Sequence, residues 1–206
     1  MNPNWAEENL QTIRTLMERS ALYRRALAPI MLFAGTLGIV AAAIGLLFHF
    51  DEMHSFGPLW LGTAALVLVG SFFITRQQAI RADEKFWSSP TRRVAQALFP
   101  PLFSGMFIGI VYIFTGAAPS MIAAFWLFFY GCALHSAGFF MPRGIRYFGW
   151  VFIGFACVVL CVLCVLIFYF SDADINGNWL MGFFFGVLHL AYGAYLYLTE
   201  KKNPTA

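Results

Sequence analysis

Charged residues are scarce in this sequence and are missing from its longest segments. Only 11% of the 206 residues are Asp, Glu, Lys or Arg, whereas 60% are apolar and the mean hydropathy is +0.72. Soluble domains carry roughly 25% charged residues, so this composition excludes a soluble globular protein. All 23 charged residues lie outside six apolar runs, which cover residues 26–50, 57–75, 97–115, 117–141, 147–170 and 179–198.

The six runs have the length and composition of transmembrane helices. They contain 19 to 25 residues each, and a helix needs about 20 residues to cross a hydrocarbon core of about 30 Å. Strands of a membrane barrel would be about 10 residues long and would alternate with polar lumen positions, which these runs lack. The predicted fold class is all-α, a polytopic membrane protein with six transmembrane helices.

Basic residues are missing from one side of the predicted membrane domain. The N-terminal segment, the connection between the second and third runs, the turn between the fourth and fifth runs, and the tail together hold all 13 Lys and Arg. The opposite connections contain Asp51, Glu52, Asp172 and Asp174 instead. The positive-inside rule predicts that both termini are cytoplasmic in an inner membrane. No large basic domain surface is left for nucleic acid.

Cysteine is absent from every predicted outer connection. The four cysteines, Cys132, Cys157, Cys161 and Cys164, lie inside the apolar runs, so no disulfide framework is indicated. The first run has 25 residues and follows a segment that contains Glu7, Glu8 and Glu18. A signal peptide has an apolar region of about 7 to 15 residues after a short basic stretch, so we expect the first run to be retained.

Three parts are expected along the chain. Residues 1–25 are predicted to form a cytoplasmic interfacial amphipathic helix, because Leu10, Ile13 and Met17 recur on one face and arginines flank it. The alternative is that this face docks on the bundle or on a partner. Residues 26–198 form the transmembrane domain, and residues 199–206 form a cytoplasmic tail.

The connection at residues 76–96 is the only sizeable inner loop. Phe86 and Trp87 are predicted to anchor it at the membrane interface, and Thr91 is predicted to cap a helix that starts before the third span. Pro100 and Pro101 are expected to disturb the start of that span. The arginines of the loop favour contact with lipid, and the alternative is a site for an anionic ligand.

No span contains a formal charge, so the few polar groups inside the spans are the candidate functional positions. Ion-coupled carriers and proton pumps usually keep charged groups in the membrane, and their absence argues against that class. The candidate buried polar positions are His135, Ser136 and His189. Both histidines lie on helix faces rich in glycine, formed by Gly131 and Gly138 around His135 and by Gly182, Gly186 and Gly193 around His189. Such faces pack against other helices, so both histidines are expected to point into protein.

The sequence does not favour two more specific functions of these residues, haem ligation and proteolysis. Shared haem ligation needs histidines at one depth, but His135 lies much farther than His189 from the outer end of its run. Rhomboid proteases also have six spans, a serine on the fourth and a histidine on the sixth. Here Ser136 has no glycine two residues before it and lies near the inner end of its run. We therefore predict no cofactor and no catalytic residue.

Two groups of residues have the side chains that metals prefer. Cys157, Cys161 and Cys164 share the C-x3-C-x2-C spacing of iron–sulfur enzymes, but on a membrane helix this spacing makes one face of packing residues. A soft-metal site is the alternative. His49, Asp51, Glu52 and His54 form a candidate outer-face site for a divalent metal. The alternative is an acidic outer connection that follows from topology alone.

Four segments resemble those of a group of bacterial multi-span proteins with no known activity. They are LMERS at residues 16–20, FWSSPTRR at 86–93, FMPRGIRY at 140–147 and GVLHLAYG at 186–193. The resemblance covers most of the chain. It implies a bacterial inner-membrane location and supplies no substrate, cofactor or catalytic residue.

The sequence favours a membrane protein that acts through contacts. We expect a non-catalytic assembly, sensory or regulatory component that contacts the lipid bilayer and a membrane or cytoplasmic protein partner. The alternative is a small transporter of an uncharged or lipophilic solute, which the uncharged spans also permit. An enzyme is the least favoured class.

Overall fold

The computed structural model describes residues 27–81, 83, 86–116, 118–169 and 175–202. Six of its helices are long and apolar enough to cross a membrane, so the predicted all-helical fold class is confirmed. The amphipathic helix expected at residues 1–25 lies outside the described residues.

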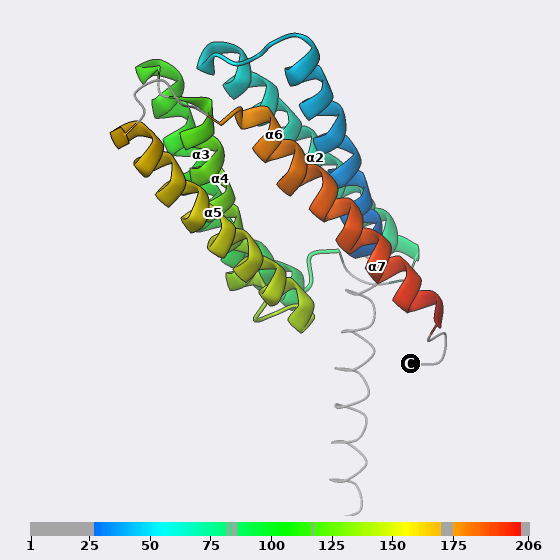
Figure 1. The fold of residues 1–206 in the computed structure, drawn as a ribbon. Helices are drawn as coiled ribbons and strands as arrows, with labels where there is room; N and C mark the ends of the chain where they lie inside the picture. Colours follow the sequence, from blue (N-terminus) through cyan, green and yellow to red (C-terminus); the bar gives the residue numbers. More distant parts are fainter. Residues whose placement is uncertain (1–26, 82, 84–85, 117, 170–174, 203–206) are drawn as a thin grey trace, which may run out of the picture.

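Six spans follow one another as antiparallel helices (Figure 1). The first span is Leu27–Leu47. It is followed by α2 (Met53–Arg81), α3 (Ser89–Thr115), α4 (Pro119–Ala137) and α5 (Arg143–Tyr169). The last span consists of α6 (Gly177–Met181), the π-helix η1 (Gly182–Val187) and α7 (Leu188–Lys202).

The third helix starts earlier than its apolar run and is not capped by Thr91. Its N-cap is Ser88, whose hydroxyl lies 3.0 Å from that of Thr91. The predicted cap is therefore wrong by one turn. Proline is tolerated in the first turn of the helix because the backbone N–H groups there have no partner within the helix.

Pro100 and Pro101 do not interrupt α3, which continues through both of them. Next to this pair, the Ser104 hydroxyl donates a hydrogen bond to the Pro100 carbonyl at 2.9 Å. The Phe99 and Phe103 rings stack with centroids 5.6 Å apart, and both side chains are exposed on the apolar surface. The disturbance expected from the two prolines therefore does not end the helix.

A left-handed backbone occurs at Asp83 and in two turns that end helices, at Gly116 and His49. Gly116 has a φ of 70° after α3, and its N–H donates to the Tyr112 carbonyl at 3.1 Å. His49 has a φ of 53° after the first span, and the following Phe50 N–H donates to the Gly45 carbonyl at 2.8 Å. Both arrangements satisfy carbonyls at a helix end and reverse the chain within a few residues.

Glycines bring the first and last spans into close contact. A Cβ atom at Gly38 would lie 2.5 Å from the Phe185 carbonyl oxygen, and one at Gly186 would lie 2.7 Å from the Ile39 side chain. Gly182 and Gly193 likewise face the first span, at Ala42 and Leu32. The prediction that the glycines pack against another helix is confirmed, and close backbone approach is the usual basis of helix association in lipid. His189, which the sequence spacing placed on the same face, instead contacts Tyr130 of α4 and rings of α5.

Aromatic rings, by contrast, fill the space between α5 and the last span. Phe148 stacks on Tyr192 with centroids 4.7 Å apart, and Phe152 meets Phe184 edge to face at 5.7 Å. Phe152 is completely buried. The last span thus contacts one neighbour through glycine and another through a layer of rings.

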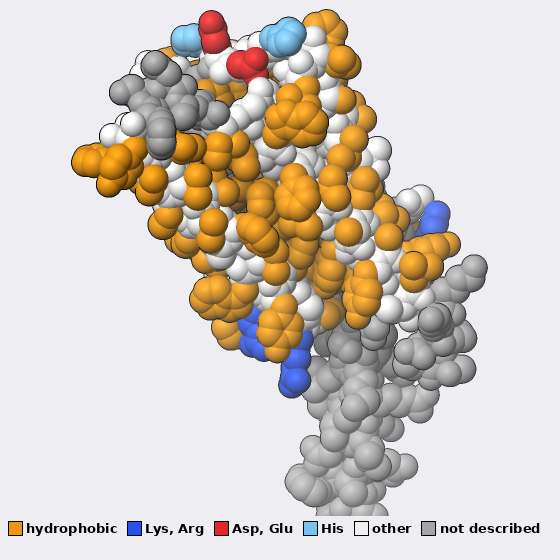
Figure 2. All heavy atoms as spheres, in the orientation of Figure 1, with side chains coloured by type: hydrophobic (Ala, Val, Ile, Leu, Met, Phe, Trp, Pro, Cys, Tyr) orange, Lys and Arg blue, Asp and Glu red, His pale blue; other side chains and the backbone are white. Residues whose placement is uncertain are grey.

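The described charges gather at opposite ends of the bundle, as Figure 2 shows on one face. We call the end with Asp51 and Glu52 the acidic end, and the end with Arg143 and Arg146 the basic end. The surface between them is covered by exposed apolar side chains, including Phe107 on α3 and Val158 on α5. This distribution is that of a helical bundle surrounded by lipid.

The close contact between the first and last spans predicts how single substitutions affect stability. Gly186→Leu should lower the melting temperature in detergent strongly, because overpacking costs about 1–3 kcal/mol or more where backbones touch. Gly62→Leu is the matched control, since nothing lies within 4 Å of a Cβ at that position. His189→Gln should have a smaller effect than Gly186→Leu, because Gln can keep one hydrogen bond. Equal melting temperatures for the two leucine variants would contradict this packing.

Candidate functional site

His189 on α7 is the most deeply buried titratable residue in the described part of the bundle. Its side chain is 1% exposed. Nε2 lies 2.7 Å from the Tyr130 hydroxyl on α4, and Nδ1 lies 3.0 Å from the Phe184 carbonyl oxygen on η1. One imidazole thus connects the last span both to α4 and to its own preceding turn.

The partners of His189 define its tautomer when the ring is neutral. A carbonyl oxygen only accepts hydrogen bonds, so Nδ1 carries the proton and donates it to the Phe184 carbonyl. Nε2 is then the acceptor, and the Tyr130 hydroxyl donates to it. Both ring nitrogens are therefore used within the chain, and neither has a lone pair left for a metal.

The π-helix positions the carbonyl that His189 uses. In η1 the hydrogen bonds span five residues, as in the bond from the Leu188 N–H to the Phe183 carbonyl. Phe184 likewise lies five residues before His189 and accepts from the His189 side chain. A π turn inserts an extra residue into a helix and often marks a functional position.

Aromatic rings surround the imidazole. Phe148 and Phe152 of α5 lie 5.3 and 5.6 Å from it between centroids, and Phe185 stacks on it at 5.8 Å. Among the described residues, the hydrogen bonds and ring contacts of His189 involve no acidic or basic side chain. The site is an uncharged hydrogen-bonded pair inside an aromatic layer.

His135 and Ser136 are not part of this pair. Both are half-buried, and His135 lies five residues beyond Tyr130, about 7.5 Å farther along α4. The His135 ring contacts Phe139 at 5.3 Å and Trp150 at 5.1 Å. Its Nδ1 atom is buried and has no hydrogen-bond partner among the described residues. The structure therefore assembles neither the serine–histidine pair of a rhomboid-type protease nor a bis-histidine haem site.

A second buried polar residue, Asn178, was missed by the sequence analysis. It is 1% exposed at the start of the last span. Its Oδ1 atom accepts from Trp60 Nε1 of α2 at 3.0 Å, and its Nδ2 group donates to the Phe50 carbonyl at 3.0 Å. Asn178 therefore joins the first connection, α2 and the last span at the acidic end. The signal in the sequence was an amide placed directly before the apolar run.

The network around Asn178 extends to the surface through a capping residue. Asn176 is the N-cap of α6, and its Oδ1 atom accepts from the Asn178 N–H at 2.8 Å. Its Nδ2 group donates to Asp51 Oδ1 at 2.6 Å. Asp51, one of the candidate metal ligands, is thus used to hold the last span against the first connection.

The candidate outer metal site does not converge in the described residues. His49 Nδ1 lies 3.9 Å from Asp51 Oδ2, and the His49 side chain is 87% exposed. Glu52 and His54 are exposed. Among the described residues, no group of three or more His, Cys, Asp or Glu side chains is placed to hold a metal ion.

The three cysteines of α5 do not pack inside the bundle. Cys157, Cys161 and Cys164 are all exposed on the apolar surface, and Cys132 on α4 is half-buried. The packing role predicted for the three is therefore wrong for this chain. The buried face of α5 is formed instead by larger side chains such as Phe148, Phe152 and Leu163.

The Asn178 network predicts a large effect of its removal. Asn178→Leu should lower the melting temperature in detergent, because it leaves the Phe50 carbonyl and the Trp60 indole N–H unpaired, at about 1–3 kcal/mol for each buried group. Trp60→Phe removes one of the two bonds and should have a smaller effect. A melting temperature for Asn178→Leu equal to that of the wild type would show that water replaces both bonds.

Comparison of the chain with protein families, with curated proteins and with solved structures finds no match.

Proposed function

We propose that this protein is a non-catalytic component of a bacterial inner membrane that acts through contacts, as an assembly, sensory or regulatory protein. The observation that carries the proposal is the use of its buried polar groups. His189 and Asn178 are each 1% exposed, and the polar atoms of both side chains are bonded to other helices or turns of the same chain.

A carrier needs polar groups that a solute can reach in the middle of the membrane. Here the mid-membrane polar pair, Tyr130 and His189, is enclosed by rings from α5 and the last span. These groups contribute to helix association, as hydrogen bonds between transmembrane helices commonly do. The arrangement supports a stable scaffold more than a transport path.

The basic end offers groups that are free to contact a partner. Arg76, Arg81, Arg92, Arg93 and Arg143 are exposed. Within the described residues, no carboxylate lies within 4.0 Å of any of them in an ion pair. Their charges are thus available to anionic lipid or to an acidic protein surface.

The proposed orientation places this basic end in the cytoplasm. It is supported by the sequence, in which all 13 Lys and Arg lie on one side of the spans. In this orientation both termini are cytoplasmic and the acidic end faces outward. The same orientation directs the exposed arginines toward a cytoplasmic partner or toward the inner leaflet.

Labelling of single cysteines tests the orientation. In a background without the four native cysteines, Glu52→Cys should react with an impermeant thiol reagent in intact cells, and Arg92→Cys should react only after the cells are opened. Both positions are exposed, so access to the thiol is matched. Labelling at residue 92 alone in intact cells would reverse the proposed topology.

Flux measurements separate the contact protein from the transporter. Purified protein in liposomes with a proton, sodium or potassium gradient should show no flux above empty vesicles, because the spans contain no charged stepping stones. Swelling in glycerol or urea should also match that of empty vesicles. Flux of any of these solutes that is lost in His189→Gln or His135→Gln would overturn the proposal in favour of transport.

A further inference from the structure

Two arginines lie in the first turn of α5, at the basic end of the bundle. Arg143 begins α5, and Arg146 follows one turn later. Arg143 is exposed and Arg146 is half-buried. No described carboxylate forms an ion pair with either of them. Paired guanidinium groups with free donors match the geometry of a phosphate group.

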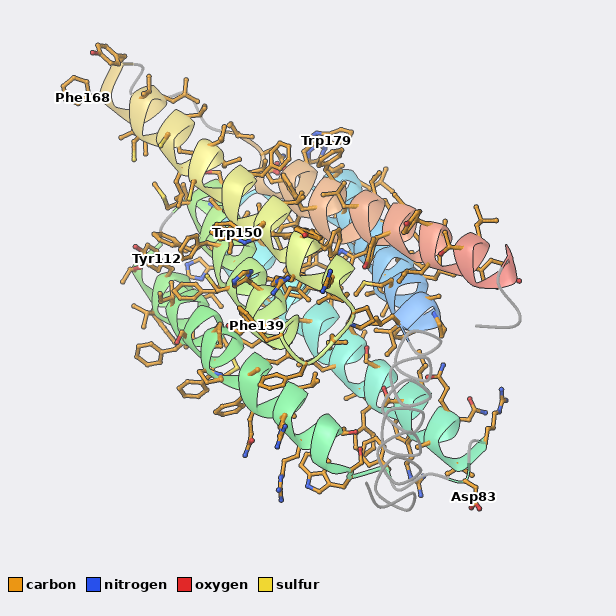
Figure 3. The ribbon with its side chains drawn as sticks, turned by 90° about the horizontal axis from the view of Figure 1, so that it is seen from below. Asp83, Tyr112, Phe139, Trp150, Phe168 and Trp179 are labelled. Carbon is orange, nitrogen blue, oxygen red and sulfur yellow. The ribbon has the colours of Figure 1, made fainter. Side chains whose placement is uncertain are left out.

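Side chains of α4 and of the turn that follows it contact this part of α5. The Arg146 guanidinium carbon lies 5.3 Å above the Phe139 ring. The Phe139 ring meets the His135 ring at 5.3 Å, and His135 in turn meets Trp150 at 5.1 Å. Figure 3 labels Phe139, in the turn that follows α4, and Trp150 on α5, seen from below. The four groups form a continuous series of contacts, edge to face between the rings, so Arg146 and Trp150 are positioned before any ligand arrives.

The same face of α5 continues from the arginines into the apolar region. Arg143, Arg146, Trp150 and Gly154 follow one another at intervals of three and four residues, which is one helix face. Trp150 is 56% exposed, about 10 Å along the helix from Arg143. With the arginines at the level of the headgroups, Trp150 lies toward the hydrocarbon side of the membrane interface, a region in which tryptophan is enriched. At Gly154 nothing lies within 4 Å of where a Cβ would be.

We propose that this face binds one anionic phospholipid, with its phosphate on Arg143 and Arg146, its glycerol region beside Trp150 and an acyl chain across Gly154. A free phosphate would share the contact with the arginines. The continuation of the face past Trp150 into the hydrocarbon assigns the ligand to the lipid. The inference goes beyond the proposed function, since it holds whether or not a protein partner exists.

Lipid binding to the purified full chain tests the site. The protein in non-ionic detergent is titrated with phosphatidylglycerol or with phosphatidylcholine of the same acyl chains, and bound lipid is counted by native mass spectrometry. Arg143→Gln with Arg146→Gln should weaken phosphatidylglycerol binding roughly tenfold, because charge-assisted hydrogen bonds are lost. Arg92→Gln with Arg93→Gln removes the same charge from the same end and should weaken phosphatidylglycerol binding much less.

Three further measurements test the lipid site: a lysine variant, a brominated lipid and competition by inorganic phosphate. Arg143→Lys with Arg146→Lys should retain part of the binding, and it replaces the glutamine variant if that variant does not fold. Phosphatidylglycerol brominated on its acyl chains should quench the fluorescence of the wild type more than that of Trp150→Phe. Equal loss of binding in the Arg92 and Arg93 control, equal binding of phosphatidylcholine, or displacement of the lipid by millimolar inorganic phosphate would each overturn the site.

Discussion

The close contact between the first and last spans is the constraint on which the rest of the bundle depends. In lipid no hydrophobic force drives two apolar helices together, so association needs close packing and hydrogen bonds. Gly38 and Gly186 lie at this contact, where a Cβ atom would meet backbone or a neighbouring side chain at less than 3 Å. Because this face of the last span packs against the first span, another side of the last span contacts α4 and α5. His189 lies on that second side.

The π-helix allows the last span to contact the first span and α4 at the same time. The glycines of the last span must face the first span, while His189 must reach Tyr130 on α4. A π turn changes the rotation of the residues that follow it relative to those before it. It also presents the Phe184 carbonyl to the imidazole. Hydrogen bonding to the side chain compensates for irregular backbone pairing, which would be costly within a membrane.

Sequence patterns predicted the spans and the glycine face but not the polar connections between helices. The length of an apolar run and the position of charged residues depend on the bilayer. They therefore locate the transmembrane helices without any knowledge of the tertiary fold. Asn178 precedes its apolar run and therefore looks like an outer polar residue, although Trp60 and Phe50 enclose it. Such contacts join residues 118 and 128 positions apart, which no local pattern reports. The packing role predicted for the cysteines of α5 was wrong for the same reason. The spacing of residues defines a helix face but does not tell which element packs against it.

The two ends of the bundle differ in how their polar groups are used. At the acidic end, Asn176 donates a hydrogen bond to Asp51, and Asn178 donates one to the Phe50 carbonyl. These bonds join the first connection to the last span. At the basic end, the arginines have no described ion-pair partners, and Arg146 is oriented by an aromatic ring instead. A charge held by a ring keeps its hydrogen-bond donors available, whereas a charge held by a carboxylate does not. The side chains whose charge suits an anionic group are therefore concentrated at the basic end, and the opposite end is closed by hydrogen bonds.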